Sequence, residues 1–94
     1  MIASFRSKAL KRFWENDDSR GINPQWVAKI VLILDALDNA VTPAELDVAT
    51  FGFHALIGDM AGRYAIRVTR NWRITFAWEG ESGIEVDLED YHGR

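Results

Sequence analysis

The chain has 94 residues, of which 48% are hydrophobic, and its net charge is −3. This length predicts one small domain over residues 1–94, with enough apolar side chains for a core. The sequence contains no cysteine, which excludes disulfides and thiolate metal sites. Its longest apolar run, over 30–34, is too short to span a bilayer, and its start lacks the apolar stretch of a signal peptide. We therefore expect a cytoplasmic protein with no membrane partner.

The negative net charge argues against a protein that binds nucleic acid through bulk charge alone. The basic residues are nevertheless clustered. Four of them lie between positions 6 and 12, and four arginines lie between 63 and 73 with no acidic residue among them. The acidic residues gather in 35–47 and 79–90. A local basic face on an acidic protein therefore remains possible.

The first half of the chain predicts a helix after a short candidate strand over residues 2–5. Ser7 has the position of an N-cap, and the helix is expected over 8–15. Leu10, Phe13 and Trp14 form its apolar stripe. The opposite side of this helix carries its basic residues, which are Lys8, Lys11 and Arg12.

A second helix is predicted over 24–38, because Asn23 suits the N-cap and Pro24 suits the first helical position. Its apolar residues recur at helical spacing. Thr42 and Glu45 have the spacing of a capping box, which predicts a short helical turn over 43–47. The segment over 51–56 is either a strand or an extended loop, and the glycine-containing segment over 58–62 is expected to be a flexible link.

The last third of the chain alternates apolar and polar residues in three runs, which predicts half-buried antiparallel strands. The apolar positions are Tyr64, Ile66 and Val68; Trp72, Ile74, Phe76 and Trp78; and Ile84, Val86 and Leu88. Turn-forming residues over 69–71 and 79–83 separate the runs. This order of elements predicts an α+β fold, in which a small twisted antiparallel sheet has two N-terminal helices packed on one face.

We expect the other face of this sheet to be free, with Arg67 and Arg73 projecting from it together. A cross-strand pair of Arg67 with an acidic residue, Glu85 or Asp87, would explain that arginine equally well. The large aromatic residues of the middle run, Trp72, Phe76 and Trp78, are expected in the core rather than as stacking platforms for bases.

Four short motifs follow one another along the chain: I-x-S-F at the start, G-D-x-x-G before a strand, I-R-V-x-x-N-W-R-I-T-F, and the closing E-D-Y-H. Each motif is weak alone. The ordered set, which covers nearly the whole chain, resembles the HigB-like toxins of the RelE/ParE superfamily of bacterial toxin–antitoxin systems. The resemblance implies a RelE-like fold.

The resemblance further implies a ribosome-dependent endoribonuclease that cuts mRNA in the decoding site without a metal or another cofactor. Its partner would be a HigA-like antitoxin with a helix-turn-helix domain. The matching catalytic positions are His54, Arg73, Asp90, Tyr91 and His92. Contacts to mRNA or ribosomal RNA would come from Arg67, Arg70, Lys8, Lys11 and Arg12.

Metal-free RNA cleavage needs a base for the 2′-OH, a cation for the phosphate and an acid for the departing 5′-oxygen. Imidazoles suit both proton-transfer roles near neutral pH, and which histidine is the acid stays open. The planar fork of Arg73 matches phosphate oxygens. Tyr91 would stack on a base or donate a hydrogen bond, and Asp90 would orient an imidazole or accept from a base edge.

Two other functions remain open. The ParE branch of the superfamily poisons DNA gyrase by binding, which needs no imidazole pair, so the two histidines argue against it. The third possibility is an inactive homologue that only binds its antitoxin. Two departures keep this possibility open: relatives often carry lysine at the position of Ile57, and they are commonly basic.

Overall fold

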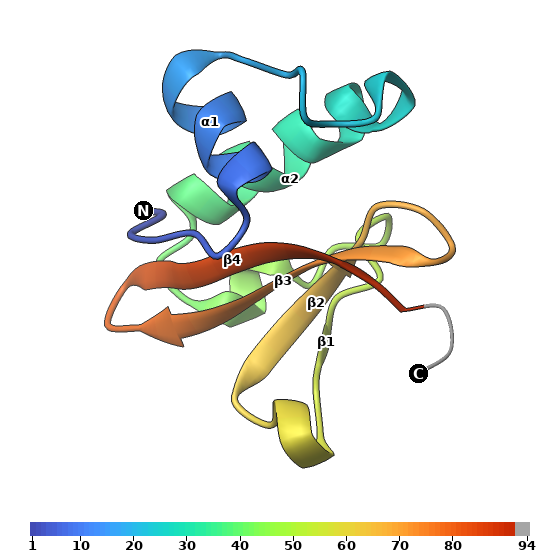
Figure 1. Cartoon of the computed structure of the whole chain (residues 1–94). Coiled ribbons are helices and arrows are strands. Elements are labelled where there is room, and N and C mark those ends of the chain that lie inside the picture. Colours follow the sequence, from blue (N-terminus) through green and yellow to red (C-terminus); the bar gives the residue numbers. More distant parts are fainter. Residues whose placement is uncertain (92–94) are drawn as a thin grey trace.

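A computed structural model describes residues 1–91 of the chain. Within this range, α1 (Lys8–Asn16) and α2 (Val27–Asn39) precede a four-stranded antiparallel sheet. Its strands, adjacent in sequence order, are β1 (His54–Ala55), β2 (Arg63–Arg67), β3 (Trp72–Glu79) and β4 (Ser82–Asp90). Both helices lie on one side of the sheet (Figure 1), which confirms the predicted α+β architecture. No helix of these 91 residues is long and apolar enough to cross a membrane.

The helices and helical turns begin where the capping residues predict. The Ser7 side chain accepts a hydrogen bond from the backbone N–H of Leu10, at 3.1 Å. Asn23 caps a 3₁₀ turn that leads directly into α2. Glu45 accepts from the backbone N–H of Thr42, as in a capping box. These bonds satisfy backbone donors that have no partner within the first turn, which is why local sequence is enough to locate them.

The core lies between the helices and one face of the sheet. Its fully buried members from α2 and the sheet are Ile30, Ile33, Leu34, Leu37, Ile66, Ile74, Phe76 and Val86. The Phe76 ring lies 5.7 Å from the Tyr64 ring and 6.2 Å from the Trp78 ring, measured between centroids. Trp72 packs on Trp26, just before α2, with the ring centroids 5.2 Å apart. The predicted core position is therefore confirmed for Phe76 and Trp78, whereas Trp72 is half-buried and packs on Trp26 outside the core cluster.

The opposite face of the sheet, which we call the polar face, is not free along its whole length. Ala65 and Thr75 are fully buried there, and Arg63 is only 8% exposed. The Arg63 guanidinium donates to the Thr75 hydroxyl at 3.1 Å and to the Glu85 carbonyl oxygen at 2.8 Å. The prediction of a free face is thus wrong at its centre, because polar side chains that bond one another also bury one another.

A β-bulge in β4 changes the phase of its alternation. Ala77 pairs with Ile84, but Thr75 pairs with Asp87, so β4 has one extra residue in this stretch. Glu85, inside the bulge, has a φ of 51°, in the left-handed region. Ile84 consequently shares the polar face with Thr75. The prediction that Ile84 lies on the same face as Val86 and Leu88 is therefore wrong.

Two short segments, over 2–5 and 58–62, differ from the expected elements, and the segment over 51–56 falls within the two alternatives that its sequence leaves open. Residues 2–5 form no continuous strand, and instead make two isolated parallel bridges to β4 at Ile2 and Phe5. The segment over 51–56 contributes the two-residue strand β1, and the expected link over 58–62 contains the 3₁₀ turn Gly58–Met60.

Candidate active site

The register of the sheet puts three candidate side chains on the polar face. His54 pairs with Ala65, and Arg67 pairs with Arg73. Residues two apart along a strand share a face, so the side chains of positions 65 and 67 point to the same side. His54, Arg67 and Arg73 therefore lie together on the side away from the helices. The predicted joint projection of the two arginines is confirmed.

The turn before β1 orients the His54 ring. Its Nδ1 lies 3.1 Å from the carbonyl oxygen of Gly52. A carbonyl oxygen only accepts hydrogen bonds, so Nδ1 carries the proton in this contact and the neutral ring has its lone pair on Nε2. Gly52 has a φ of 57°, which favours glycine, and a Cβ there would lie 3.5 Å from the Arg67 guanidinium carbon. His54 is exposed at the surface of the polar face.

Tyr91 connects His54 with Arg73. With His54 it lines an open pocket of about 600 Å³, whose full lining is His54, Ala55, Leu56, Ile57, Met60 and Tyr91. The Tyr91 ring centroid also lies 5.0 Å from the guanidinium carbon of Arg73. Its backbone N–H donates to the Asn71 carbonyl oxygen at 2.5 Å, which fixes this residue beside the β2–β3 turn.

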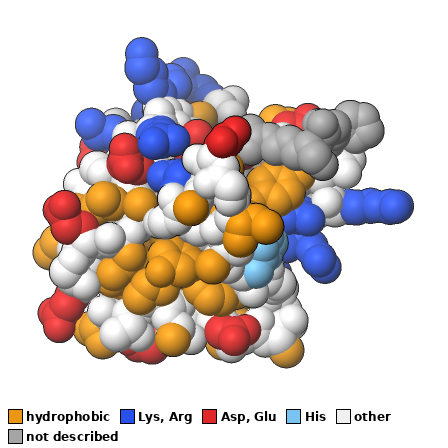
Figure 2. All heavy atoms as spheres, turned by 90° about the horizontal axis from the view of Figure 1, so that it is seen from below, with side chains coloured by type: hydrophobic (Ala, Val, Ile, Leu, Met, Phe, Trp, Pro, Cys, Tyr) orange, Lys and Arg blue, Asp and Glu red, His pale blue; other side chains and the backbone are white. Residues whose placement is uncertain are grey.

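The surface around this pocket combines two kinds of chemistry. Figure 2 shows the pale-blue histidine between hydrophobic side chains and a group of Lys and Arg side chains. Ile57 is 88% exposed and forms part of the apolar wall. An apolar wall beside cationic groups suits a ligand that has both an apolar and an anionic part.

Arg73 is held by the turn between β2 and β3. Its NH1 donates to the carbonyl oxygens of Thr69 at 2.6 Å and of Arg70 at 2.9 Å. Its buried Nε has no hydrogen-bond partner within residues 1–91. Burial, followed by the charge of Arg67, lowers the pKa of Arg73, whereas Tyr91 raises it. A desolvated guanidinium beside another cation would be stabilised by a bound anion.

The remaining predicted residues are not all brought to this place. Arg70 is exposed in the β2–β3 turn. Asp90 pairs with Trp72, and this register puts it on the face opposite Arg73. His92 lies outside the described residues. The basic residues of α1 are exposed; they are Lys8, Lys11 and Arg12. The core side of this helix packs on the face of the sheet opposite Arg73, so these residues lie away from the pocket.

The sequence did not indicate two features of this region: the apolar pocket wall, and the buried bonds of Arg63 at the centre of the polar face. The apolar residues over 55–57, which follow His54, were the local sign of the first. Nothing in the alternation distinguishes Arg63 from Arg67. Among residues 1–91, no three His, Cys, Asp or Glu side chains gather as a candidate metal site.

Comparison with known proteins identifies relatives over almost the full chain. A family model described as the RelE-like toxin of the type II toxin–antitoxin system HigB matches residues 3–92. The Endoribonuclease HigB of Proteus vulgaris is 38% identical over 92 residues, which cover 98% of this chain and 100% of that protein.

Solved structures with a similar fold share less sequence. A chain of the YoeB-YefM complex from Staphylococcus aureus superposes with a TM-score of 0.61, at 19% identity and 98% coverage of both chains. YafQ from E. coli gives a TM-score of 0.55 at 11% identity, covering 96% of this chain and 93% of that one. At these identities the likeness concerns the fold alone.

Proposed function

The chain belongs to the HigB-like family of RelE-like toxins of type II toxin–antitoxin systems, and from this we propose that it is a ribosome-dependent endoribonuclease that cleaves mRNA in the decoding site. The relative at 38% identity carries the name of an endoribonuclease. The structural observation that best supports the proposal is the position of Tyr91, which borders a pocket with His54 and lies over the guanidinium of Arg73.

Cleavage would proceed through the 2′-OH without a metal. His54 Nε2 would take the proton from this hydroxyl, because Nδ1 is occupied by the Gly52 carbonyl oxygen. Arg73 would bind the scissile phosphate and stabilise the charge that develops on it. His92 would then protonate the departing 5′-oxygen.

The shape and polarity of the pocket support a nucleotide as the ligand. A base is apolar on its ring faces, and its phosphate is anionic. The base would lie against Ile57 and Met60 and stack on Tyr91, while the phosphate would lie towards Arg73. Arg67 and Arg70 would contact the neighbouring backbone.

The ribosome would supply the binding energy that the chain lacks. Phosphate contacts dominate non-specific affinity for RNA, and this protein has a net charge of −3. We therefore propose that the site acts on mRNA already positioned in a cytoplasmic ribosome. Lys8, Lys11 and Arg12 would contact ribosomal RNA from α1, away from the pocket.

An antitoxin is the partner that a toxin of this family requires. We propose a HigA-like protein with a helix-turn-helix domain, encoded next to this chain. Binding to the native state adds stability by mass action, so the complex should unfold at higher temperature than the toxin alone. Equal toxicity with and without the co-expressed neighbour would contradict this pairing.

The test is expression without antitoxin, combined with cleavage by the purified protein. We expect transcripts cut within codons, and single-turnover cleavage of mRNA on programmed ribosomes that is much faster than cleavage of the same free RNA. An SOS response with intact transcripts would indicate a gyrase poison instead. Normal growth with intact transcripts would indicate an inactive homologue.

A further inference from the structure

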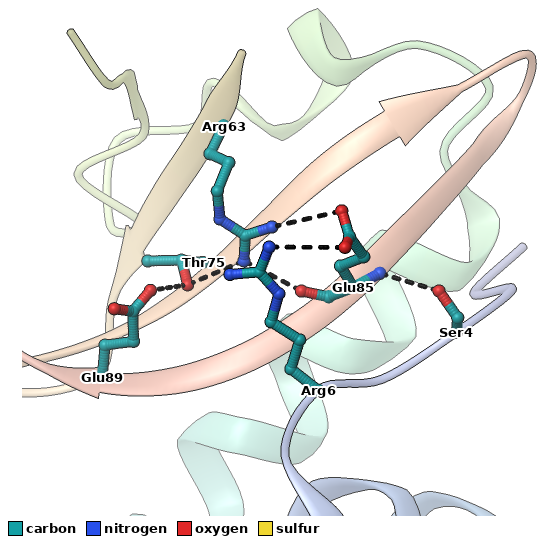
Figure 3. Close-up of polar contacts among 6 residues, drawn as sticks. All are labelled: Ser4, Arg6, Arg63, Thr75, Glu85 and Glu89. Atoms are coloured by element: carbon teal, nitrogen blue, oxygen red, sulfur yellow. Dashed lines mark hydrogen bonds and ion pairs between the residues drawn. The ribbon is translucent and has the colours of Figure 1, made fainter. Parts of the chain in front are cut away.

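Arg73 and Glu89 pair directly in the register of β3 and β4. Opposite charges at such positions normally attract one another across the strands. Here the Glu89 carboxylate instead accepts a short hydrogen bond from the Thr75 hydroxyl, as Figure 3 shows. No ion pair joins Arg73 to Glu89 within residues 1–91. The direction of Glu89 matters, because a carboxylate on Arg73 would compete with the phosphate of a substrate.

The hydroxyl that holds Glu89 is itself fixed by Arg63. Thr75 is fully buried, and its oxygen accepts a hydrogen bond from Arg63 NH2 at 3.1 Å. A hydroxyl has only one proton to donate. Thr75 therefore directs that proton to Glu89 while it accepts from Arg63.

The β-bulge fixes Arg63 in turn. The same NH2 donates to the Glu85 carbonyl oxygen at 2.8 Å, and NH1 lies 3.9 Å from the Glu85 carboxylate. Glu85 is also held from outside the sheet, because Arg6 contacts its carboxylate at 3.3 Å and Ser4 accepts from its backbone N–H at 2.9 Å (Figure 3). This bonded chain begins at the N-terminal segment and ends at the glutamate that faces Arg73 in register.

The electrostatic surroundings of the two arginines agree with this geometry. Burial is the largest influence on Arg63 and lowers its pKa, while the charges of Glu89 and Glu85 act to raise it. The influences on the pKa of Arg73 are burial, Arg67 and Tyr91. The negative charge of Glu89 is thus among the influences on the pKa of Arg63.

We propose that Arg63 and Thr75 are positioning residues, which hold Glu89 away from Arg73 and so keep the Arg73 guanidinium available to the scissile phosphate. This rests on the proposed function, since it assigns Arg73 to the phosphate. Neither residue touches the substrate. Their effect is to prevent an ion pair that the strand register would otherwise favour.

The test removes the Thr75 hydroxyl while preserving its shape. Thr75→Val should release Glu89 towards Arg73 and slow single-turnover mRNA cleavage on programmed ribosomes by about tenfold or more. Thr75→Ser, which retains the hydroxyl, should cut at nearly the wild-type rate. Adding Glu89→Gln to Thr75→Val should restore most of the lost rate, because the amide cannot neutralise Arg73. A purely structural role of Thr75 would not be rescued in this way.

Two results would overturn the proposal: a folded Thr75→Val protein that cuts at the wild-type rate, or a double variant no faster than Thr75→Val. If Thr75→Val does not fold, the cleavage rate of the single variant Glu89→Gln tests the proposal instead. The amide oxygen still accepts from Thr75, so this variant should cut at least as fast as wild type. A loss of about tenfold would mean that Glu89 takes part in the chemistry, which contradicts the proposal.

A crystal structure of Thr75→Val provides a readout that does not depend on activity. We expect the Glu89 carboxylate within ion-pair distance of the Arg73 guanidinium. An unchanged direction of Glu89 would overturn the positioning role even in an inactive protein. Failure of the wild-type protein to cut mRNA on ribosomes would count against the proposed function instead, and the two failures are thereby distinguished.

Discussion

The two faces of the sheet arise from the same alternating strands but are held together by different forces. The face towards the helices buries Ile66, Ile74 and Phe76 completely, and each such side chain contributes roughly 1.5–3 kcal/mol through removal of apolar surface from water. The polar face buries Arg63 and Thr75 through hydrogen bonds. Bonds from a charged guanidinium contribute roughly 1.5–3 kcal/mol each, and the cost of removing that charge from water offsets this contribution. The apolar face therefore contributes most of the stability of the fold, and the polar face fixes the positions of its side chains.

The polar face itself changes along its length. At its centre the guanidinium of Arg63 is closed in by Thr75 and the bulge of β4. Towards the β2–β3 turn the contacts become local, because NH1 of Arg73 bonds carbonyl oxygens of that turn. Within residues 1–91 both arginines keep buried nitrogens without a hydrogen-bond partner, Nε in Arg73 and Nε and NH1 in Arg63. The two arginines thus differ in what they bond: Arg63 reaches across the sheet to Thr75 and Glu85, whereas Arg73 bonds its own turn and lies beside Arg67 and Tyr91.

The largest effect on stability is expected on the apolar face. Phe76→Ala should lower the free energy of unfolding by about 3–5 kcal/mol, because the cavity would lie at the centre of the core. This is a large part of the roughly 5–15 kcal/mol of a typical domain. Urea denaturation measures the loss, with Phe76→Leu as a milder control. A cost below about 1 kcal/mol would refute the division between the two faces.

Substitutions on the polar face should instead lower the rate of mRNA cleavage. His54→Ala should slow cleavage on programmed ribosomes by about 10²–10⁴-fold, the usual contribution of a general base. The urea midpoint should stay close to that of the wild-type protein, because this side chain is exposed and its hydrogen bond to the Gly52 carbonyl oxygen is local. Comparable losses of stability and activity would show that His54 supports the turn rather than the reaction.

A smaller and purely structural effect is expected at the start of α1. Ser7→Ala should cost about 1 kcal/mol of stability, since it removes the acceptor for the Leu10 N–H. The cleavage rate at a temperature where the variant is folded should not change. Ser7→Asp, which keeps an acceptor at the cap, serves as the matched control. A slower rate in the folded Ser7→Ala protein would link α1 to the site.

The smallest effect concerns the apolar wall of the pocket. Ile57→Lys adds a cation beside His54 and should steepen the salt dependence of single-stranded RNA binding by about 0.7 per phosphate contacted. Ile57→Met should leave this slope unchanged. Binding measured over a series of salt concentrations provides the comparison. An identical slope for Ile57→Lys would mean that no phosphate passes this wall.

The caps and the apolar face could be read from sequence because their signals are local. Ser7 and Asn23 bond backbone groups within three residues of themselves, and the row through Ile74 and Phe76 follows strand periodicity. The same periodicity predicted that Arg67 and Arg73 lie on one face, and their pairing bears this out.

The interior of the polar face could not be predicted, because it depends on contacts between distant segments. Arg63 meets Glu85, which is 22 positions away, only because an extra residue in β4 changes its phase. Alternation marks Arg63 and Arg67 as equivalent, and only the register with the bulge separates them. The arrangement of Tyr91 over Arg73 likewise needs β4 to return beside the β2–β3 turn.

The most direct test of the proposed site is single-turnover mRNA cleavage on programmed ribosomes by Arg73→Ala. Arg20→Ala, which removes an exposed arginine paired with Asp18, is the matched control. Cleavage by Arg73→Ala should be about 10²–10³-fold slower than wild type, with little rescue by Arg73→Lys, and with circular dichroism and antitoxin binding preserved. The Arg20→Ala rate should equal that of wild type. A folded Arg73→Ala protein that cuts at nearly the wild-type rate would contradict the assignment of this arginine to the phosphate, and with it the site as described.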